Sequence, residues 1–491
     1  MDYLDPRKRM RHTIILYTGY VLIGIAIVIA TTVLLYQAYG FGIDRKGKVI
    51  QNGLVFISSQ PAPADIYVSG HLEGSQTNTR LSLPEATYDV QLRRAGYTPW
   101  QRSVIVEGGK VLHIDYPLLT PVNLNSTKLF NFVKAPSFSS QSPDKRWLIT
   151  GRSETQDLFD LFDLKNPTKA PSQLSLPANL LTPAAGPTDL SAIEWADDNQ
   201  HILLKHSFAG KLEYILLDRQ NPSQSVNLNT SIAPNLGQLS LIDRKYDKYY
   251  SYDPAGLTLS KASLKAPGTT VVLSGVIAFK PYGNDVILYA TSIGASSGKT
   301  RIQLKVNDQS YTIRSVAADG NYLLDITTFN NTFYVVAGAS SENRLYVYED
   351  PAGQIGNNLF RSPVPTQVLR VTAPNFVSFS SNTQYIMAEN GSQFSVFDIQ
   401  NKRGYNFTSK VALDTPQTHA SWLDGNRLTL VSGGKQVFVD YDNQNLRTLG
   451  AASPNYTLSV ASDIRYTYTI VKLPDGQAYL NQTALRIPSE L

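Results

Sequence analysis

The stretch Pro136–Gly151, PSFSSQSPDKRWLITG, decides the fold because it joins a short apolar strand, a polar turn and a second, strongly apolar strand. Units of this shape return along the chain at a spacing of roughly 40–50 residues. The later units begin at Ser191, Leu239, Val276, Tyr322, Phe376, His419 and Tyr456. Strand, turn and strand repeated at this period are typical of propeller blades, which bury their faces against one another.

Many of these units continue into a further alternating strand that ends in a second polar turn. Examples are 159–164, 213–218, 394–399 and 436–441. Eight units fit the repeat, and seven blades remain the alternative if one unit is a broken blade. The sequence therefore predicts an all-β propeller over 120–491.

The last repeat lacks a fourth strand after Ala478–Arg486. We expect Leu124–Val133, which precedes the first full repeat, to supply it. Such a closure joins the two ends of the ring and removes an exposed strand edge. On this hypothesis, trimming Thr120–Val133 should sharply lower the thermal stability.

The first repeat also carries a recognisable turn. Ser142-Pro143-Asp144-Lys145-Arg146-Trp147-Leu148-Ile149 is similar to the Ser-Pro-Asp-Gly-x-x-hydrophobic turn of TolB-type and WD-like propellers. The other repeats keep the shape of this turn with weaker residues. The resemblance therefore implies the architecture and no particular family of propellers.

A long apolar run stands near the start of the chain. Ile14–Tyr36, IILYTGYVLIGIAIVIATTVLLY, has no charged residue. As a helix it would be roughly 34 Å long, enough to cross a hydrocarbon core of about 30 Å. A cleaved signal peptide is the alternative, but the run exceeds the usual length of such segments and no small-x-small cleavage site follows. We therefore expect residues 13–39 to be an uncleaved transmembrane signal anchor.

The orientation of this anchor follows from the charges around it and from the body of the chain. The basic residues are Arg7, Lys8, Arg9 and Arg11 before the span and Arg45, Lys46 and Lys48 after it. The positive-inside rule thus favours an inner N-terminus by four to three. The large, weakly charged body that follows is rich in Asn, Ser, Thr and Tyr, which suits an exterior domain. We expect residues 1–12 to be a cytoplasmic tail and the C-terminal domains to be extracytoplasmic.

A compact β-pattern begins at Gly53, after a polar, Gly-containing linker over 40–52. Val104–Val106 and Val111–Tyr116 flank Glu107-Gly108-Gly109-Lys110, which is a hairpin signal, so we expect these two strands to pair. Tyr97 and Trp100 are expected to pack in the core. The strands predicted before them are 54–57, 66–68, 81–83 and 88–92.

The segment 53–119 resembles the PEGA domain. The residues that carry the resemblance are Ser58-Ser59-Gln60-Pro61, Ile66-Tyr67-Val68-Ser69-Gly70, Pro84-Glu85-Ala86-Thr87-Tyr88-Asp89-Val90 and Gly96-Tyr97-Thr98-Pro99-Trp100. Ala86 stands where the family's name has Gly. The resemblance implies a small β-sandwich-like module of exported and surface proteins, with no catalytic activity and no settled ligand.

Composition agrees with this organisation and excludes several classes of protein. Charged residues make up 17% of the chain, below the roughly 25% of soluble domains. Tyr (28), Gly (32) and Pro (27) are plentiful, which is typical of β-structure and turns. The absence of cysteine excludes disulfides, thiolate metal sites and cysteine nucleophiles. The net charge is only +5 and no Lys/Arg stripe is interleaved with aromatics, so nucleic acid is not expected as a partner.

Two strings look like catalytic motifs but lack the required context. Gly294-Ala295-Ser296-Ser297-Gly298 matches the G-x-S-x-G nucleophile elbow, yet it links two predicted β-strands, Val286–Tyr289 and Arg301–Val306. The elbow needs a strand, a sharp turn and a helix. Gly298-Lys299-Thr300 resembles part of a phosphate-binding loop, but the spacing is wrong by one residue and no helix follows.

Metal-binding side chains are scattered rather than clustered. His201 and His206 are five residues apart on a predicted strand, so they should point to opposite faces, and a zinc site is not expected. We interpret the aspartates at turns and strand edges as turn-capping residues rather than calcium ligands. These are Asp157, Asp160, Asp163, Asp440 and Asp442.

These features together predict a single-pass membrane-anchored, extracytoplasmic binding or scaffold protein, with no enzymatic activity, metal or cofactor. The expected partner, besides the membrane, is an envelope protein or polysaccharide. The alternatives are an accessory propeller of an envelope hydrolase and a structural component of a surface layer. Fold alone does not decide among them.

Overall fold

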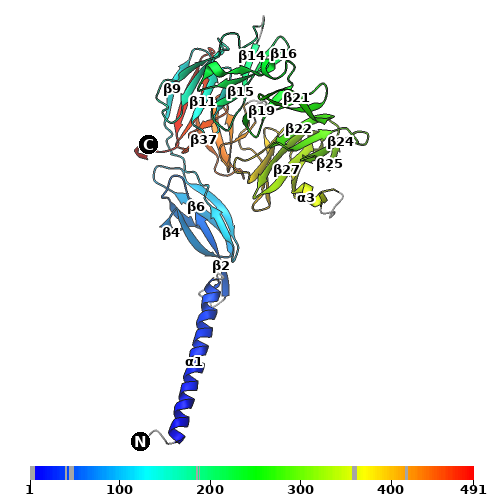
Figure 1. The fold of residues 1–491 in the computed structure, drawn as a ribbon. Coiled ribbons are helices and arrows are strands. Elements are labelled where there is room, and N and C mark those ends of the chain that lie inside the picture. Colours follow the sequence, from blue (N-terminus) through cyan, green and yellow to red (C-terminus); the bar gives the residue numbers. More distant parts are fainter. Residues whose placement is uncertain are drawn as a thin grey trace. The chain divides into compact units, whose positions relative to one another are not determined.

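A computed structural model describes residues 6–38, 41–43, 49–183, 186, 188–356, 362–414 and 419–490. The chain divides into two compact units, Met1–Val122 and Asn123–Leu491. The first unit contains the long helix α1 and two small sheets, and the second is built from strands in series (Figure 1). The predicted fold class, all-β apart from one N-terminal helix, is confirmed.

Helix α1 spans Pro6–Ala38. Its segment Met10–Tyr36 has a mean hydropathy of 2.3 and none of its apolar surface is buried inside the protein. The hydroxyls of Thr18 and Thr32 donate hydrogen bonds to backbone carbonyls one turn earlier, at 2.9 and 2.7 Å. Polar side chains that bond to their own helix need no water, which is the condition that a lipid environment imposes.

The strands of the first unit form two sheets among the described residues. One sheet has the order β4 (His71–Gln76), β3 (Asp65–Val68), β6 (Ala86–Arg93) and β7 (Trp100–Val106). In the other, β2 (Val49–Ile57) pairs with β1 (Phe41–Ile43), β5 (Thr79–Pro84) and β8 (Val111–Ile114). Side chains from both sheets form a sandwich core, and they include Val55, Ile57, Ile66, Val68, Val90 and Leu92. Tyr97 and Trp100 are buried in this unit, as predicted.

The hairpin predicted for Val104–Val106 and Val111–Tyr116 is wrong. Strand β7 pairs with β6, whereas β8 runs parallel to β2 in the other sheet. The Gly-Gly turn still redirects the chain, but its backbone bonds to β2: Gly109 N–H donates to Asn52 O at 2.9 Å. Gly53 permits this approach, because a Cβ there would lie only 2.6 Å from Cγ1 of Val106.

The stretch predicted as a linker, 40–52, is also partly ordered as strand. Phe41–Ile43 pairs with the beginning of β2 over Val49–Gln51. The sequence did not predict this pairing because the stretch is polar. A short two-stranded extension of a sheet buries little surface, so it needs few apolar residues. Residues 44–48, which include the predicted flanking charges Arg45, Lys46 and Lys48, lie outside the described residues.

The second unit is a β-propeller in which the described strands form eight four-stranded antiparallel sheets, as the sequence repeat predicts. Blades one to four comprise β10 (Ser139–Gln141), β11 (Trp147–Gly151), β12 (Leu158–Asp163), β13 (Ser172–Ser175); β14 (Thr188–Trp195), β15 (His201–Phe208), β16 (Lys211–Asp218), β17 (Val226–Asn227); β18 (Gln238–Ile242), β19 (Lys245–Asp253), β20 (Thr258–Ser263), β21 (Ala266–Ser274); and β22 (Val276–Tyr282), β23 (Val286–Thr291), β24 (Lys299–Val306), β25 (Gln309–Ala317).

The remaining blades follow the same plan. They comprise β26 (Tyr322–Phe329), β27 (Thr332–Ala339), β28 (Arg344–Glu349), β29 (Gln367–Arg370); β30 (Phe376–Phe379), β31 (Tyr385–Glu389), β32 (Gln393–Asp398), β33 (Arg403–Thr408); β34 (Ser421–Trp422), β35 (Arg427–Ser432), β36 (Lys435–Asp440), β37 (Arg447–Ala451); and β38 (Ser459–Val460), β39 (Tyr466–Lys472), β40 (Ala478–Ala484), β9 (Ser126–Phe132). Short helices α2 (Leu228–Ser231) and α3 (Pro351–Gly356) and the 3-10 turns η2 (Pro222–Gln224) and η3 (Ser340–Glu342) connect strands, and η4 (Pro488–Glu490) follows the last strand.

The burial pattern explains why the strands differ in composition. First strands of neighbouring blades contact one another, so they lie innermost. Second strands such as β31 are buried along their whole length, because adjacent blades cover both of their faces. Outermost strands such as β21 are largely exposed. The core consequently lies between blades, and one such cluster joins Ile149 and Phe159 of the first blade to Ile202 and Ile215 of the second.

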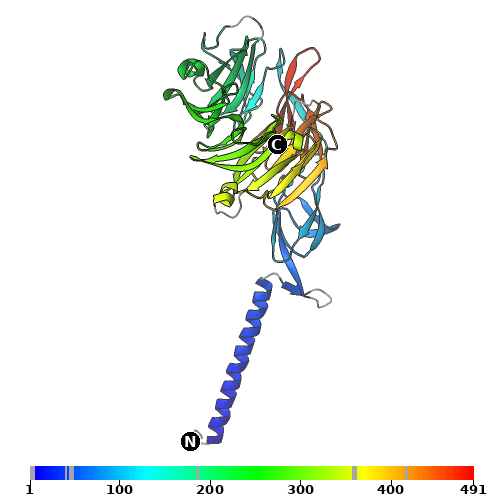
Figure 2. The same ribbon diagram turned by 90° about the vertical axis from the view of Figure 1, so that its right-hand side faces the viewer.

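The ring is closed by a strand from its own beginning, as the sequence predicts. Strand β9 pairs antiparallel with β40, so the last blade contains three C-terminal strands and one that precedes the first blade. Figures 1 and 2 show the two ends of the domain together at this blade. Phe132 packs there with Tyr468 and Leu480 and, across the closure, with Leu148 and Phe162 of the first blade.

Candidate functional site

One edge of the propeller carries the turns that follow the first and the third strand of each blade. The term "turn edge" is used here for the part formed by residues 142–146, 196–200, 219–225, 243–244 and 264–265 of the first three blades. These turns are built in a common way from side chains that hydrogen-bond to the local backbone.

The turn after the first strand is fixed by an Asp and a residue with positive φ. In the first blade, Asp144 Oδ1 accepts from Arg146 N–H at 3.1 Å and Lys145 has φ 60°. In the second, Asp198 Oδ1 accepts from Gln200 and His201 N–H at 2.8 and 3.0 Å. The Ser-Pro-Asp motif found in the sequence is therefore an Asp-capped turn, and other blades reproduce it without the proline.

An Asp at the end of the third strand fixes the second turn of the blade. Asp163 accepts both Arg146 guanidinium N–H groups, at 3.1 and 3.0 Å, and the N–H of Lys165. The hydrogen bond from Arg146 is the main reason why the pKa of Asp163 lies below its ordinary value. Asp218 takes the same position in the second blade and accepts from the N–H groups of Gln220 and Asn221, both at 2.9 Å.

A cavity of about 440 Å³ opens at the turn edge, formed by the second and third blades. Its lining combines two carboxylates, two amides, a histidine, a tyrosine and aliphatic side chains. These residues are Asp198, Gln200, His201, Leu216, Asp218, Gln224, Val226, Tyr246 and Leu264. Its volume is that of a site for a small ligand, which is typically about 300–1,000 Å³.

His201 of the second blade and Tyr246 of the third meet in this cavity's lining. Their rings are stacked at 4.0 Å with an interplanar angle of 13°. His201 Nδ1 lies 2.6 Å from Asp198 Oδ2, while its Nε2 lies 3.8 Å from Asp218 Oδ2. Burial alone would raise the pKa of Asp198, but hydrogen bonds from the backbone of His201 and Gln200 and from the His201 ring outweigh it and hold the pKa below its ordinary value.

A tryptophan flanked by two guanidinium groups lies beside the cavity. Arg146 and Arg219 are 4.6 and 4.3 Å from the centre of the Trp147 ring. Arg219 also donates to the backbone carbonyl of Asn199 at 2.5 Å within the second blade, while its contact with Trp147 reaches the first blade. Burial lowers the pKa of Arg219 below its ordinary value.

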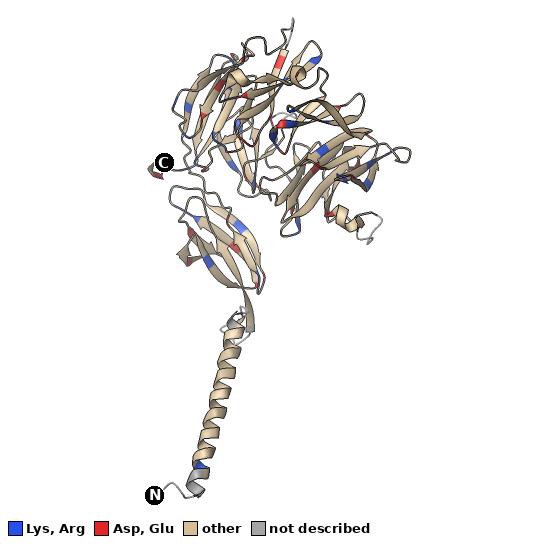
Figure 3. Cartoon of the chain, in the orientation of Figure 1, with Lys and Arg blue, Asp and Glu red and all other residues tan. Residues whose placement is uncertain are grey.

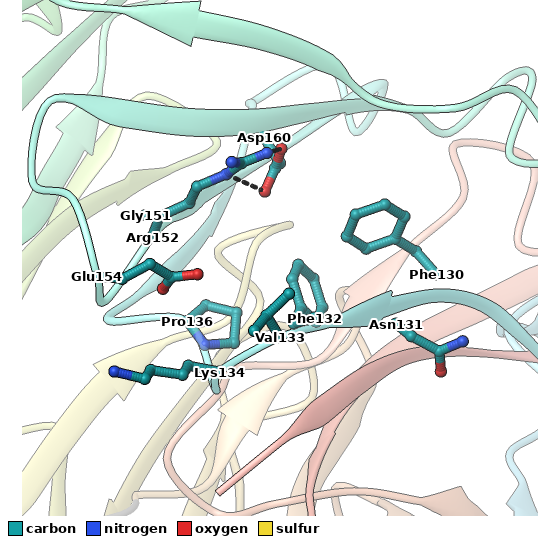
Figure 4. A pocket seen from close by; sticks show the side chains of 10 residues that line it. All are labelled: Phe130, Asn131, Phe132, Val133, Lys134, Pro136, Gly151, Arg152, Glu154 and Asp160. Atoms are coloured by element: carbon teal, nitrogen blue, oxygen red, sulfur yellow. Dashed lines mark hydrogen bonds and ion pairs between the residues drawn. The ribbon is translucent and has the colours of Figure 1, made fainter.

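A second, smaller cavity of about 80 Å³ lies at the ring closure (Figure 4). Phe130, Phe132 and Val133 form its apolar side. Opposite them, Arg152 makes a bidentate ion pair with Asp160, with N–O distances of 2.7 and 3.1 Å. The small volume and the aromatic side chains of β9 in the lining are consistent with a role in the closure of the ring.

Two carboxylates are buried at the opposite edge of the propeller. Glu213 accepts hydrogen bonds from Thr182, Asn227 and the ring of His206, whose Nδ1 lies 2.7 Å away. Burial alone would raise the pKa of Glu213, but these donors outweigh burial and hold the pKa below its ordinary value. The four polar contacts make this cluster a structural one.

Glu389 is different because it has a single protein donor. Its Oε1 accepts from Ala420 N–H at 2.9 Å and lies 3.2 Å from His419 Nδ1, while its Oε2 has no partner among the described residues. Burial raises the pKa of Glu389 to about 7 and lowers the pKa of His419, which stacks on Phe376 at 4.4 Å. Burial thus disfavours the charged form of both groups.

The motifs questioned in the sequence lie where the strand pattern places them. Gly294–Gly298 joins β23 to β24, so it is a loop between strands and Ser296 is not on an elbow. His201 and His206 lie on opposite faces of β15 and contact different partners. Asp163 caps a turn, whereas Asp160 is paired with Arg152. Within the described residues, no three His, Asp or Glu side chains lie close enough to hold a metal ion.

Sequence reasoning missed most of the cavity's lining. Tyr246 and Gln224 belong to different blades, and neither stands in a motif. Their proximity results from the packing of one blade on the next, which no local pattern encodes. His201 and Asp198 alone could have been found, since His three residues after Asp at the beginning of a strand is the spacing of an Asp-capped turn.

Comparison with known proteins identifies one domain. Residues 52–121 match the model of the PEGA domain. The match confirms the resemblance seen in the sequence, and it covers the two-sheet sandwich of the first unit. None of the curated proteins matches the chain.

Solved structures resemble the chain at low sequence identity. One is an uncharacterized protein, lmo1340, from Listeria monocytogenes EGD-e, with 12% identity, a TM-score of 0.41, and coverage of 68% of this chain and 93% of that one. Another is an oligogalacturonate lyase in complex with manganese, with 12% identity, a TM-score of 0.41, and coverage of 75% and 94%. The propeller assignment made above stands on the sheets and their closure.

Proposed function

We propose that this chain is a membrane-anchored extracytoplasmic binding protein that presents a PEGA module and a β-propeller to an envelope protein or polysaccharide. The observation that carries the proposal is α1, whose apolar side chains between Met10 and Tyr36 are exposed along a segment long enough to cross a bilayer. A PEGA domain and a propeller follow it, and the blades of a propeller surround a central channel whose rim offers loops to a partner.

We further propose that the chain catalyses no reaction itself. Support comes from the state of its titratable groups. His206 is 1% exposed and its partner Glu213 is saturated with donors, so this pair cannot reach a substrate. General acid–base catalysis requires a group within hydrogen-bond reach of the reacting atom. Purified full-length protein should therefore be inactive on a panel of peptidase, esterase and glycosidase substrates, and turnover of any of them would refute this part.

The proposed orientation has the N-terminus inside and the C-terminus outside. It is tested by protease treatment of intact cells that express the full chain with a tag at each end. The C-terminal tag should be lost from intact cells, while the N-terminal tag should be cleaved only after lysis. Loss of the N-terminal tag from intact cells, with the C-terminal tag kept, would show the opposite orientation. An envelope partner would then no longer be expected.

Binding itself is tested with the full chain in lipid nanodiscs. Purified envelope polysaccharide and detergent extracts of membranes are passed over immobilised nanodiscs, with empty nanodiscs as the control. We expect saturable retention of one component that competes with the same component in solution. If neither material is retained above the empty nanodiscs, the binding function fails.

A further inference from the structure

We propose that the cavity at His201 and Tyr246 binds an uncharged, hydroxyl-rich ligand, namely a short stretch of neutral glycan. The inference rests on the proposed binding function and assigns the ligand class of one site within it. It is drawn from three features of the cavity. These are the charges around it, the polar and apolar groups that its lining leaves open, and the hydrogen bonds that fix part of the lining.

Two basic residues beside the cavity are already paired with carboxylates, and the two lining carboxylates, Asp198 and Asp218, are held by hydrogen bonds. Lys265 Nζ lies 2.8 Å from Asp247, and Arg244 lies 3.6 Å from Asp197. Asp198 bonds to His201, as described above. Figure 3 shows basic and acidic residues intermixed over the propeller in the same way. A charged ligand would have to compete with these local partners, whereas an uncharged ligand leaves them in place.

The lining nevertheless offers unused hydrogen-bonding groups. The side-chain amide of Gln224 is exposed, and neither it nor the Tyr246 hydroxyl bonds to another described residue. His201 Nε2, 3.8 Å from Asp218, is beyond hydrogen-bond distance. An amide, a phenol and an imidazole both donate and accept, which suits neighbouring hydroxyl groups better than a group that only donates or only accepts.

The apolar part of the lining suits the same ligand. Tyr246 is 39% exposed although one face of its ring is covered by His201, so aromatic surface remains at the cavity. Leu216, Val226 and Leu264 add aliphatic surface beside it. A sugar ring presents C–H groups on its faces and hydroxyls around its edge, and a site of one aromatic ring surrounded by planar polar groups matches both.

Three of the lining's polar side chains, Gln200, His201 and Asp218, are held in place before any ligand arrives. Gln200 Nε2 donates to Asp218 Oδ2 at 2.9 Å, and Asp218 is itself fixed by two backbone N–H groups. His201 is held between its stacking partner and Asp198. Such preorganisation lowers the entropic cost of binding, which matters for a ligand with many hydroxyls and few strong contacts.

The experiment uses the full chain in nanodiscs, titrated with short neutral oligosaccharides of glucose, mannose and N-acetylglucosamine. Spermine and polyglutamate serve as the cationic and anionic probes. We expect saturable binding of at least one neutral oligosaccharide and none of the two charged probes. Tyr246→Leu should weaken that binding about tenfold, as expected for the loss of one aromatic contact with its hydrogen bond. Gln224→Leu, an exposed position, should weaken it as well.

The matched control is Tyr311→Leu, a half-buried tyrosine on β25 in the fourth blade. It should leave oligosaccharide binding unchanged. Thermal unfolding of each variant shows whether the propeller remains folded, and Gln224→Leu keeps the test valid if Tyr246→Leu unfolds it.

Two results would overturn the inference. One is that no neutral oligosaccharide binds the wild-type chain, and the other is that Tyr246→Leu and Gln224→Leu both bind it as tightly as the wild type does. Saturable spermine binding that Tyr246→Leu abolishes would instead make this a site for cations. If envelope material is still retained in the binding experiment of the preceding section, the binding function stands without this site; if it is not, both fail together.

Discussion

The protonation of Glu389 is coupled to the stability of the propeller. This residue is fully buried at the end of β31, under the backbone of Ala420 and beside His419. Phe376 and Phe394 are its neighbours on the adjoining strands. Because burial raises its pKa from 4.5 to about 7, the folded state binds a proton more tightly at this position than the unfolded chain does.

We predict that the free energy of unfolding falls as the pH rises from about 4.5 to about 7 and that Glu389→Gln removes this fall. In that window the folded state holds more protons than the unfolded state, so the stability contributed by the protonated carboxyl is lost as pH increases. The variant should be more stable than the wild type at pH 8 by about 3 kcal/mol, because the pKa rises by about 2.5 units on folding.

Denaturant unfolding of the full chain at pH 5 and pH 8, followed by tryptophan fluorescence, measures both effects. Glu154→Gln is the control, because Glu154 is exposed on a loop of the first blade. If the variant and the wild type lose the same stability between the two pH values, Glu389 is not the responsible group.

Residue chemistry could be read from the sequence only where it is local. The capping role predicted for Asp163 depends on the next two or three residues, and the structure confirms it. Asp160 instead sits mid-strand in a bidentate pair with Arg152, eight residues away. Trp195 donates its indole N–H to Ser140 of the preceding blade at 3.0 Å, and Trp422 does the same to Ser378 at 3.1 Å. Such contacts between blades depend on how the blades pack in the ring. They cannot be predicted from the sequence until that packing is known.

At the scale of elements, the strands of the repeats were predictable and the partner of β8 was not. A Gly-Gly turn indicates that the chain changes direction, but it does not determine with which strand the following strand pairs. The decisive feature is Gly53 on β2, where the backbone of the turn approaches too closely for a side chain. A close approach between residues more than fifty positions apart leaves no trace in a local pattern.

We predict that Gly53→Ala destabilises the PEGA domain by about 1–3 kcal/mol, as expected for a methyl group forced into a packed contact. The added Cβ would lie 2.6 Å from Cγ1 of Val106 and 3.3 Å from the carbonyl oxygen of Lys110. Trp100 is buried in this domain, so its fluorescence reports the local unfolding.

The matched control is Gly74→Ala on the edge strand β4, where no heavy atom lies within 4 Å of an added Cβ. It should change the stability by far less than Gly53→Ala. Equal effects of the two substitutions would mean that loss of glycine's flexibility, and not the approach of the turn to β2, determines the result.

At the scale of the whole molecule, the stability of the propeller depends on closing the ring. We predict that Phe132→Ala lowers the free energy of unfolding of the propeller by about 3–5 kcal/mol. Phe132 is 7% exposed and touches both the last blade and the first. Thermal unfolding should show the loss, and Val133→Ala, at the 78% exposed neighbouring position, should have almost no effect.

Trimming of 120–133 is a less clean test of the same idea, because Thr120 belongs to the first unit. Its carbonyl accepts a hydrogen bond from Thr98 N–H at 2.8 Å. A deletion should therefore spare everything before Asn123. If Phe132→Ala and Val133→Ala are equally stable, the closure contributes little to the ring.

The second prediction at this scale concerns the anchor. Replacing Ile23, Ile25, Ile27 and Ile29 of α1 together by Arg should cost roughly 10–14 kcal/mol of membrane insertion, at roughly 2.5–3.5 kcal/mol for each residue. This variant should be released by alkaline carbonate extraction, whereas the wild type and a variant with Leu at the same four positions should remain with the membrane. Retention of the arginine variant would mean that α1 is not what holds the chain there.

The last blade also sets an order of events during synthesis. Ser126 of β9 and Thr483 of β40 are joined by hydroxyl groups 2.9 Å apart, yet they are separated by 357 positions. At roughly 5–20 residues per second, a ribosome needs roughly 20–70 s between making one and making the other. Throughout that interval β9 has no β40 with which to pair. A chain that ends before residue 478 lacks β40. Its blades therefore form an arc that cannot close into a ring, however many blades it contains.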